Sequence, residues 1–109
     1  MYDDLLDALR DIQGVQFVEY EWHTRPASDH GTVRIDFEAS DDDGDNEKQD
    51  RAWEGSVDLF THGKKPALIA AVEAALTSVC KNCWHVNSEQ FERSTGLIHT
   101  EWVFQIEAR

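Results

Sequence analysis

The sequence predicts an α+β fold in which two helices cover one face of a mainly antiparallel sheet, in the order α-β-β-β-α-β-β. Two segments carry apolar residues at helical spacing, and four of the five predicted strands alternate apolar and polar residues with a period of two. Short polar or Gly-containing stretches separate most of these segments. A length of 109 residues is typical of one domain, so we expect residues 1–109 to form a single domain.

The first helix is expected over residues 2–12. Asp3 and Asp4 suit its positively polarised N-terminal end, and Gly14 follows its last turn. Its apolar side consists of Leu5, Leu6, Leu9 and Ile12.

A strand is expected over residues 15–22 and another over 32–39, separated by a loop at 23–31 with Pro26 and Gly31 as breakers. In the first strand, one face carries Val18, Tyr20 and Trp22, and the other carries Phe17, Glu19 and Glu21; we expect the face with Glu19 and Glu21 to be the polar one, opposite the helices. The segment 40–50 is crowded with aspartate, so we expect it to be a mobile, solvated hairpin tip.

In residues 52–61 apolar and polar side chains alternate, as in a half-buried strand, and residues 62–65 are expected to form a polar turn. Pro66 then begins the longest helix, expected over 66–81, because proline is tolerated in the first helical turn. Strands at 84–91 and 97–108 should form a hairpin, whereas the first three strands should form an antiparallel meander. With both helices on the same face, the predicted core contains Ile35, Val57, Val72, Leu76 and Trp102.

The chain has 22 acidic and 10 basic residues and a formal net charge of -12. Such a charge opposes binding to nucleic acids and to anionic membranes, and it favours a basic partner. No apolar run approaches the roughly 18 residues of a spanning helix. We therefore expect no membrane partner, no specific nucleic-acid binding, synthesis in the cytoplasm and reduced thiols.

Neither a metal site nor a catalytic site follows from the motifs. Cys80, Cys83 and His85 have a ligand-like spacing, but a closed zinc site needs four ligands and no second Cys-x-x-Cys exists. An EF-type calcium loop starting at Asp41 would need glycine where Asn46 stands. Nucleophile, phosphate-loop and metalloprotease signatures are absent from the sequence. We expect a protein that is not an enzyme and has no cofactor.

The face of the sheet opposite the helices is expected to be polar, with aromatic residues nearby, and to serve as a contact surface. Tryptophan occurs once in four of the five predicted strands, and in an oligomer such residues can anchor an interface. The candidate interface residues are Trp22, Arg34, Asp36, Glu38, Trp53, Asp58 and Phe60.

Residues 53–61 (WEGSVDLFT), 68–76 (LIAAVEAAL) and 96–104 (GLIHTEWVF) resemble small tail-completion proteins of long-tailed bacteriophages and prophages. The element order is similar to that of the tail terminator family over nearly the whole chain. The resemblance implies a structural protein that forms a homo-oligomeric ring, usually of six subunits, at the head-proximal end of the tail tube. The ring would join the tube to the head-tail connector, in the neck of a virion assembled in the host cytoplasm. The alternative is a small acidic inhibitor, or a DNA mimic, that binds a basic partner.

Overall fold

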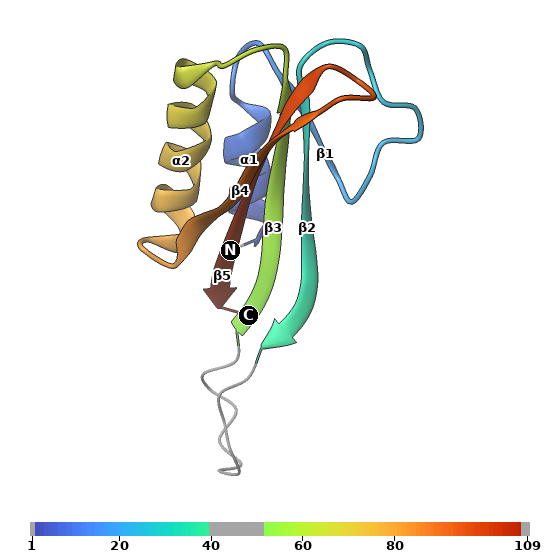
Figure 1. The fold of residues 1–109 in the computed structure, drawn as a ribbon. Coiled ribbons are helices and arrows are strands. Elements are labelled where there is room, and N and C mark those ends of the chain that lie inside the picture. The colour runs from blue at the N-terminus through green and yellow to red at the C-terminus, as the bar shows by residue number, and fades with distance from the viewer. Residues whose placement is uncertain (1, 40–51, 108–109) are drawn as a thin grey trace.

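The computed structural model describes residues 2–39 and 52–107, and it has the predicted α+β element order (Figure 1). The elements are α1 (Tyr2–Arg10), β1 (Gln16–Glu19), β2 (His30–Ala39), β3 (Ala52–Thr61), α2 (Pro66–Cys80), β4 (Trp84–Glu92) and β5 (Leu97–Glu107). The predicted acidic loop at 40–50 lies outside the described residues.

The strands form one sheet in the order β1-β2-β3-β5-β4. The predicted hairpin of β4 and β5 is confirmed, and β5 lies between β3 and β4, antiparallel to both. Strands β3 and β4 therefore run in the same direction, and α2 connects them across one face of the sheet. Strand β4 forms one edge of the sheet and β1 forms the other.

The prediction of an antiparallel meander is wrong at β1. This strand pairs with β2 in parallel, with Gln16 opposite His30 and Glu19 opposite Val33. It ends at Glu19 rather than at residue 22, because Tyr20 adopts a positive φ of 72° that interrupts extended pairing. The long segment after Tyr20 carries the chain back to the start of β2, and this return allows the parallel pairing.

The predicted faces of β1 are also reversed. Phe17 is buried in the core, whereas Tyr20 is exposed. The ring of Phe17 occupies the place of the missing side chain of Gly31, where a Cβ atom would lie 2.3 Å from it. Because side chains alternate along a strand, this packing assigns all of β1 to the opposite faces from those predicted.

Both helices lie on the same side of the sheet, as predicted (Figure 1). The core between the two layers contains Val57, Val72, Leu76 and Trp102, all fully buried, which confirms four of the five predicted core residues. The fifth, Ile35, is half-buried against the same core. Within the described residues no helix covers the other side of the sheet, which we call the outer face.

The segment from Tyr20 to Asp29 is attached to the turn between β3 and α2. Asp29 accepts hydrogen bonds from Lys65 Nζ at 2.6 Å and from the His62 backbone N–H at 2.9 Å. Burial opposes ionisation of this carboxyl, but the bonds from Lys65 and His62 outweigh burial and lower its pKa. This attachment holds residues 20–29 in place beside the outer face.

Candidate functional site

The outer face carries a row of interacting polar and aromatic side chains from β2, β3 and β5. The sheet register places His30 opposite Phe60, and Phe60 opposite His99. The next outward-facing row places Thr32 opposite Asp58, and Asp58 opposite Glu101. We call the following residues the outer-face cluster: Trp22, Arg25, His30, Thr32, Arg34, Asp58, Phe60, Glu92, His99 and Glu101.

Asp58 is the buried charged centre of the cluster. It is only 4% exposed, and both of its oxygens have partners. Arg34 Nη1 lies 2.9 Å from Asp58 Oδ2, and His99 Nε2 lies 2.7 Å from Asp58 Oδ1. Thr32 Oγ1 donates a weaker bond to Oδ2 at 3.4 Å. These partners offset the cost of burying the carboxylate and fix the positions of Arg34 and His99.

His99 has a raised pKa. The hydrogen bond with Asp58 is the largest cause; burial opposes it, while the charges of Asp58, Glu92 and Glu101 add to it. Its other ring nitrogen, Nδ1, lies 3.8 Å from Glu92 Oε2. When it is protonated, the imidazole is held between carboxylates on β3, β4 and β5 and joins the three strands electrostatically.

An aromatic stack occupies the outward-facing row next to Asp58, the row of His30, Phe60 and His99. Phe60 stacks on His30 with ring centroids 5.0 Å apart, and on His99 with centroids 4.3 Å apart. Trp22 meets His30 edge to face at 5.8 Å and donates from Nε1 to the Gly31 carbonyl at 3.1 Å. The stack therefore fixes Trp22, from the segment after β1, against the sheet.

Arg25 covers the stack from the same segment. Its guanidinium carbon lies 4.3 Å from the centre of the Phe60 ring, a cation–π distance. Its Nε donates to His30 Nε2 at 3.2 Å, and its Nη2 lies 3.3 Å from Glu92 Oε1. Because His30 Nδ1 lies 2.8 Å from the Ser28 carbonyl, the His30 ring donates from Nδ1 and accepts at Nε2.

A cavity of about 380 Å³ opens beside the cluster, lined by Tyr20, Glu21, Trp22, Arg25, Thr32, Arg34, Asp58, Phe60, His99 and Glu101. Its aromatic and apolar surface is bordered by charges of both signs. Arg25, Arg34, Asp58 and His99 are engaged in the pairs described above, and the lining includes no cysteine or serine that could act as a nucleophile beside His99. The arrangement is suited to contact with another macromolecule.

Four predicted interface residues come together here, namely Trp22, Arg34, Asp58 and Phe60. Asp36 adjoins them, because Arg34 Nε donates to its Oδ1 at 2.7 Å. Trp53 lies on the helix side of the sheet, where its ring meets Tyr2 edge to face at 6.5 Å. For Glu38 the structure gives the backbone pairing with Trp53 alone.

Sequence reasoning missed the other members of the cluster. Arg25 and His30 lie in the segment 23–31, which the sequence predicts to be a loop, and His99 is not among the predicted interface residues. The outward alternation of Phe60 and His99 was visible in the sequence, but the register that stacks their rings was not.

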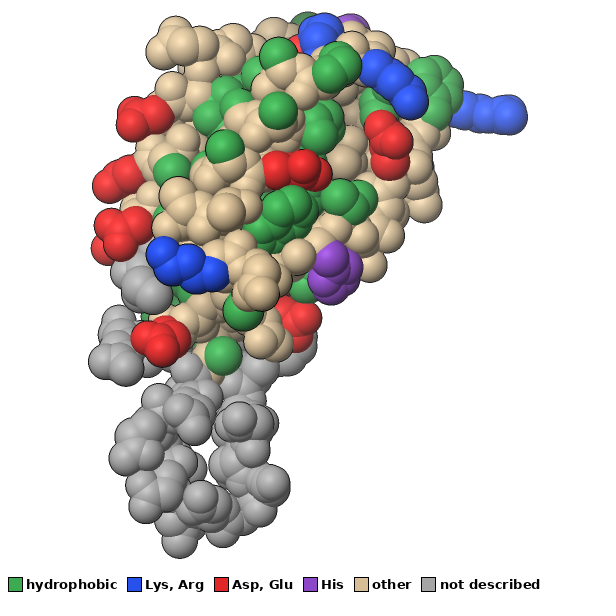
Figure 2. All heavy atoms as spheres, turned by 90° about the vertical axis from the view of Figure 1, so that its left-hand side faces the viewer, with side chains coloured by type: hydrophobic (Ala, Val, Ile, Leu, Met, Phe, Trp, Pro, Cys, Tyr) green, Lys and Arg blue, Asp and Glu red, His purple; other side chains and the backbone are tan. Residues whose placement is uncertain are grey.

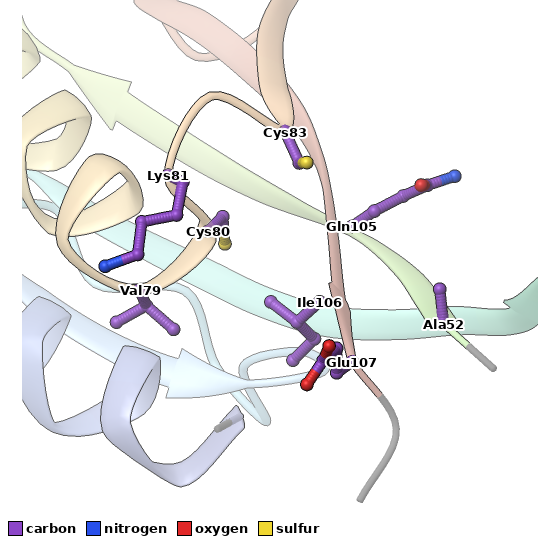
Figure 3. A pocket seen from close by; sticks show the side chains of 8 residues that line it. All are labelled: Ala52, Val79, Cys80, Lys81, Cys83, Gln105, Ile106 and Glu107. Carbon is purple, nitrogen blue, oxygen red and sulfur yellow. The ribbon is translucent and has the colours of Figure 1, made fainter. Parts of the chain in front are cut away.

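A second cavity, of about 400 Å³, lies between the end of α2 and β5 (Figure 3). Cys80 and Cys83 line it, with the first thiol buried and the second exposed. Burial, with a smaller effect of Cys83, raises the pKa of Cys80 to about 12, so this thiol is protonated at neutral pH and is a poor nucleophile.

Across residues 2–39 and 52–107, no group of three or more His, Cys, Asp and Glu side chains is placed to hold a metal ion. No helix in these ranges is long and apolar enough to cross a membrane.

Neither a protein-family model nor a curated protein matches the sequence. Among solved structures, the fold is similar to that of a chain in the virion of a native gene transfer agent (GTA) particle. The two chains are 15% identical, with a TM-score of 0.52, and the match covers 97% of this chain and 89% of that one. At this identity the likeness shows a shared fold, and it extends over nearly the full length of both chains.

Proposed function

We propose that this protein is a structural, non-enzymatic component of a phage-like virion. Within the virion we assign it a tail-terminator role, in which it forms a ring at the head-proximal end of the tail tube and joins the tube to the connector. The observation that carries the proposal is the nearly full-length fold similarity to a chain of the GTA virion. The resemblance of residues 53–61, 68–76 and 96–104 to tail-completion proteins supports the finer assignment.

The outer-face cluster supports an assembly role for this face of the sheet. A contact surface works best when its side chains are fixed before binding, because less conformational freedom is then lost. Asp58 and the stack on Phe60 fix Arg34, His99 and Trp22 in this way. Aromatic side chains and arginine are also enriched among residues that dominate binding energy.

The net charge of -12 suits a ring through which DNA passes, because carboxylates facing the lumen repel the phosphate backbone. The same charge makes subunits repel one another. Raising the ionic strength should therefore promote assembly, since screening shortens the reach of the repulsion to about 8–10 Å near physiological salt.

Two measurements test this proposal. Sedimentation velocity across salt and protein concentration should show a salt-promoted shift from monomer to ring. The protein should then be added to growing tail tubes, whose lengths are measured by electron microscopy. We expect it to bind one end of each tube and stop growth, whereas an unrelated acidic protein of similar charge should do neither.

A protein that stays monomeric under all these conditions and never stops tube growth would refute the terminator role. Tight binding to a basic protein by that same monomer would instead support the inhibitor or DNA-mimic function.

A further inference from the structure

We infer that a surface on the helix side of the sheet binds the outer face of a second copy of this chain. This inference rests on the proposed ring and names the second of the two surfaces that each subunit would use. We call it the helix-side surface, and we define it by Ala67, Ala70 and Ala74 of α2 and by Val86 and Phe91 of β4.

The helix-side surface exposes large apolar side chains on an edge strand. Phe91 is 64% exposed and Val86 is 48% exposed. Strand β4 pairs with β5 alone, so its other edge has no strand beside it in the described sheet. Exposed apolar groups along a free strand edge favour association with another chain.

A cavity of about 300 Å³ lies next to Phe91, between α2 and β5. Phe91 is the register partner of Ile98, and Ile98 lines this cavity together with Pro66, Ile69 and Ala70. The surface therefore combines a projecting aromatic ring with a hollow that can receive side chains of a partner.

Helix α2 has little charge on any side. Glu73 is the single charged residue among its 15, and its Oε2 accepts a hydrogen bond from Trp102 Nε1 at 3.0 Å. In the view of the helix side, hydrophobic side chains gather near the centre around one acidic group, and other acidic side chains lie at the left margin, the upper right and the lower right (Figure 2). An amphipathic helix normally exposes a charged face, so an apolar surface on a chain of charge -12 indicates a binding surface.

The outer face of a second copy is the occupant that the structure favours. The exposed large hydrophobic side chains of the described residues are Tyr20, Val86 and Phe91. Two of them belong to the helix-side surface, and Tyr20 lines the outer-face cavity on the opposite side of the sheet. Burying all three in one contact requires two copies that meet through different surfaces.

Charge complementarity supports the same occupant. Beside Phe91, the helix-side cavity presents Lys64 and Glu89, while the outer-face cavity presents Arg25 and Glu21 beside Tyr20. Each surface has an apolar centre bordered by both signs of charge, so opposite charges can face each other across the contact. A contact between two different surfaces is heterologous, and its repetition produces a closed ring when the rotation between subunits allows closure.

The test uses the full-length protein carrying one exposed substitution on each surface, Phe91→Ser or Tyr20→Ser. Gln13→Ser serves as a control on an exposed residue away from both surfaces, and Phe91→Leu tests whether apolar character is sufficient. Circular dichroism and thermal unfolding establish that each variant is folded. Sedimentation velocity at high salt, without tail tubes, then measures self-association.

We expect each serine variant to weaken self-association by about tenfold or more, as substitutions at interface hot spots do, while Gln13→Ser and Phe91→Leu stay near wild type. Mixing the two serine variants should produce a 1:1 dimer, because one intact junction remains and a second cannot form.

Three results would overturn the inference: a wild-type protein that is monomeric at all salt and protein concentrations, serine variants that assemble like wild type, or a mixture that contains no dimer. The outcome is separable from the terminator role. Junctions that form through these surfaces without capping tubes would refute that role alone, and capping that is unaffected by either serine variant would refute this inference alone.

Discussion

Changing Asp58 to asparagine removes a buried charge while keeping the shape of the side chain. Arg34 and His99 would both lose a charged acceptor, and hydrogen bonds to charged groups contribute about 1.5–3 kcal/mol each. Arg34 is 36% exposed and keeps its bond to Asp36, so water and that carboxylate offset part of the loss. We therefore expect Asp58→Asn to lower the free energy of unfolding by about 2–4 kcal/mol.

The loss should depend on pH through His99. In the folded protein the pKa of His99 is raised above its ordinary value of about 6.5, chiefly by the hydrogen bond with Asp58. A group whose pKa is raised by folding contributes its full stabilisation at pH values below its pKa in the unfolded chain. This contribution disappears as the pH rises through the pKa of the folded state. The effect of Asp58→Asn should therefore be larger near pH 6 than near pH 9.

Urea denaturation followed by tryptophan fluorescence can measure both effects, because the chain has four tryptophans. Asp36→Asn is the matched control. Its carboxylate is exposed and contacts the same arginine, so it should cost less than about 1 kcal/mol at every pH. A cost below about 0.5 kcal/mol for Asp58→Asn, or an equal cost at both pH values, would refute our assignment of Asp58 as the buried centre of the cluster.

Other predictions test the core, the thiols and one close contact. Leu76→Ala should cost about 2–5 kcal/mol in chemical denaturation, because the side chain is fully buried between α2 and the sheet, and a loss under about 0.5 kcal/mol would contradict that placement. Cys83 should react rapidly with a thiol reagent in the native protein, whereas the buried Cys80 should react only after unfolding; equal native rates would contradict their burial. Gly31→Ala should lower the free energy of unfolding by about 1–3 kcal/mol, because the new methyl group would overlap an aromatic ring of β1, and a neutral effect in thermal denaturation would argue against that packing.

Local patterns were sufficient to predict most of the elements. The apolar side of α1 and the stripe on α2 follow from helical periodicity, and Pro66 and Gly63 mark the turn before α2. Alternation also predicted the inward faces of β3 and β5, where Val57 and Trp102 are buried opposite each other. These signals succeed because each depends on neighbours within a few residues in the chain.

The same reasoning gave the wrong faces for β1, because this strand has an apolar residue on each side. From the sequence alone, Phe17 and Val18 are equally plausible as the buried residue. Phe17 is the buried one because its ring fills the space left by the missing side chain of Gly31. The direction of β1 likewise depends on residues 20–29, which Asp29 attaches to the turn before α2 through Lys65.

The sequence by itself determined the fold class, the element order, the two-layer arrangement of both helices on one face, and the charge that limits the range of partners. Tertiary structure alone decided the parallel pairing of β1 and the outer-face cluster. The cluster needs three strands in register, with His30, Phe60 and His99 in one row, and it needs Arg25 returned from a distant segment to cover them. Register and loop docking are set by contacts between residues far apart in the chain, and local periodicity contains no information about such contacts.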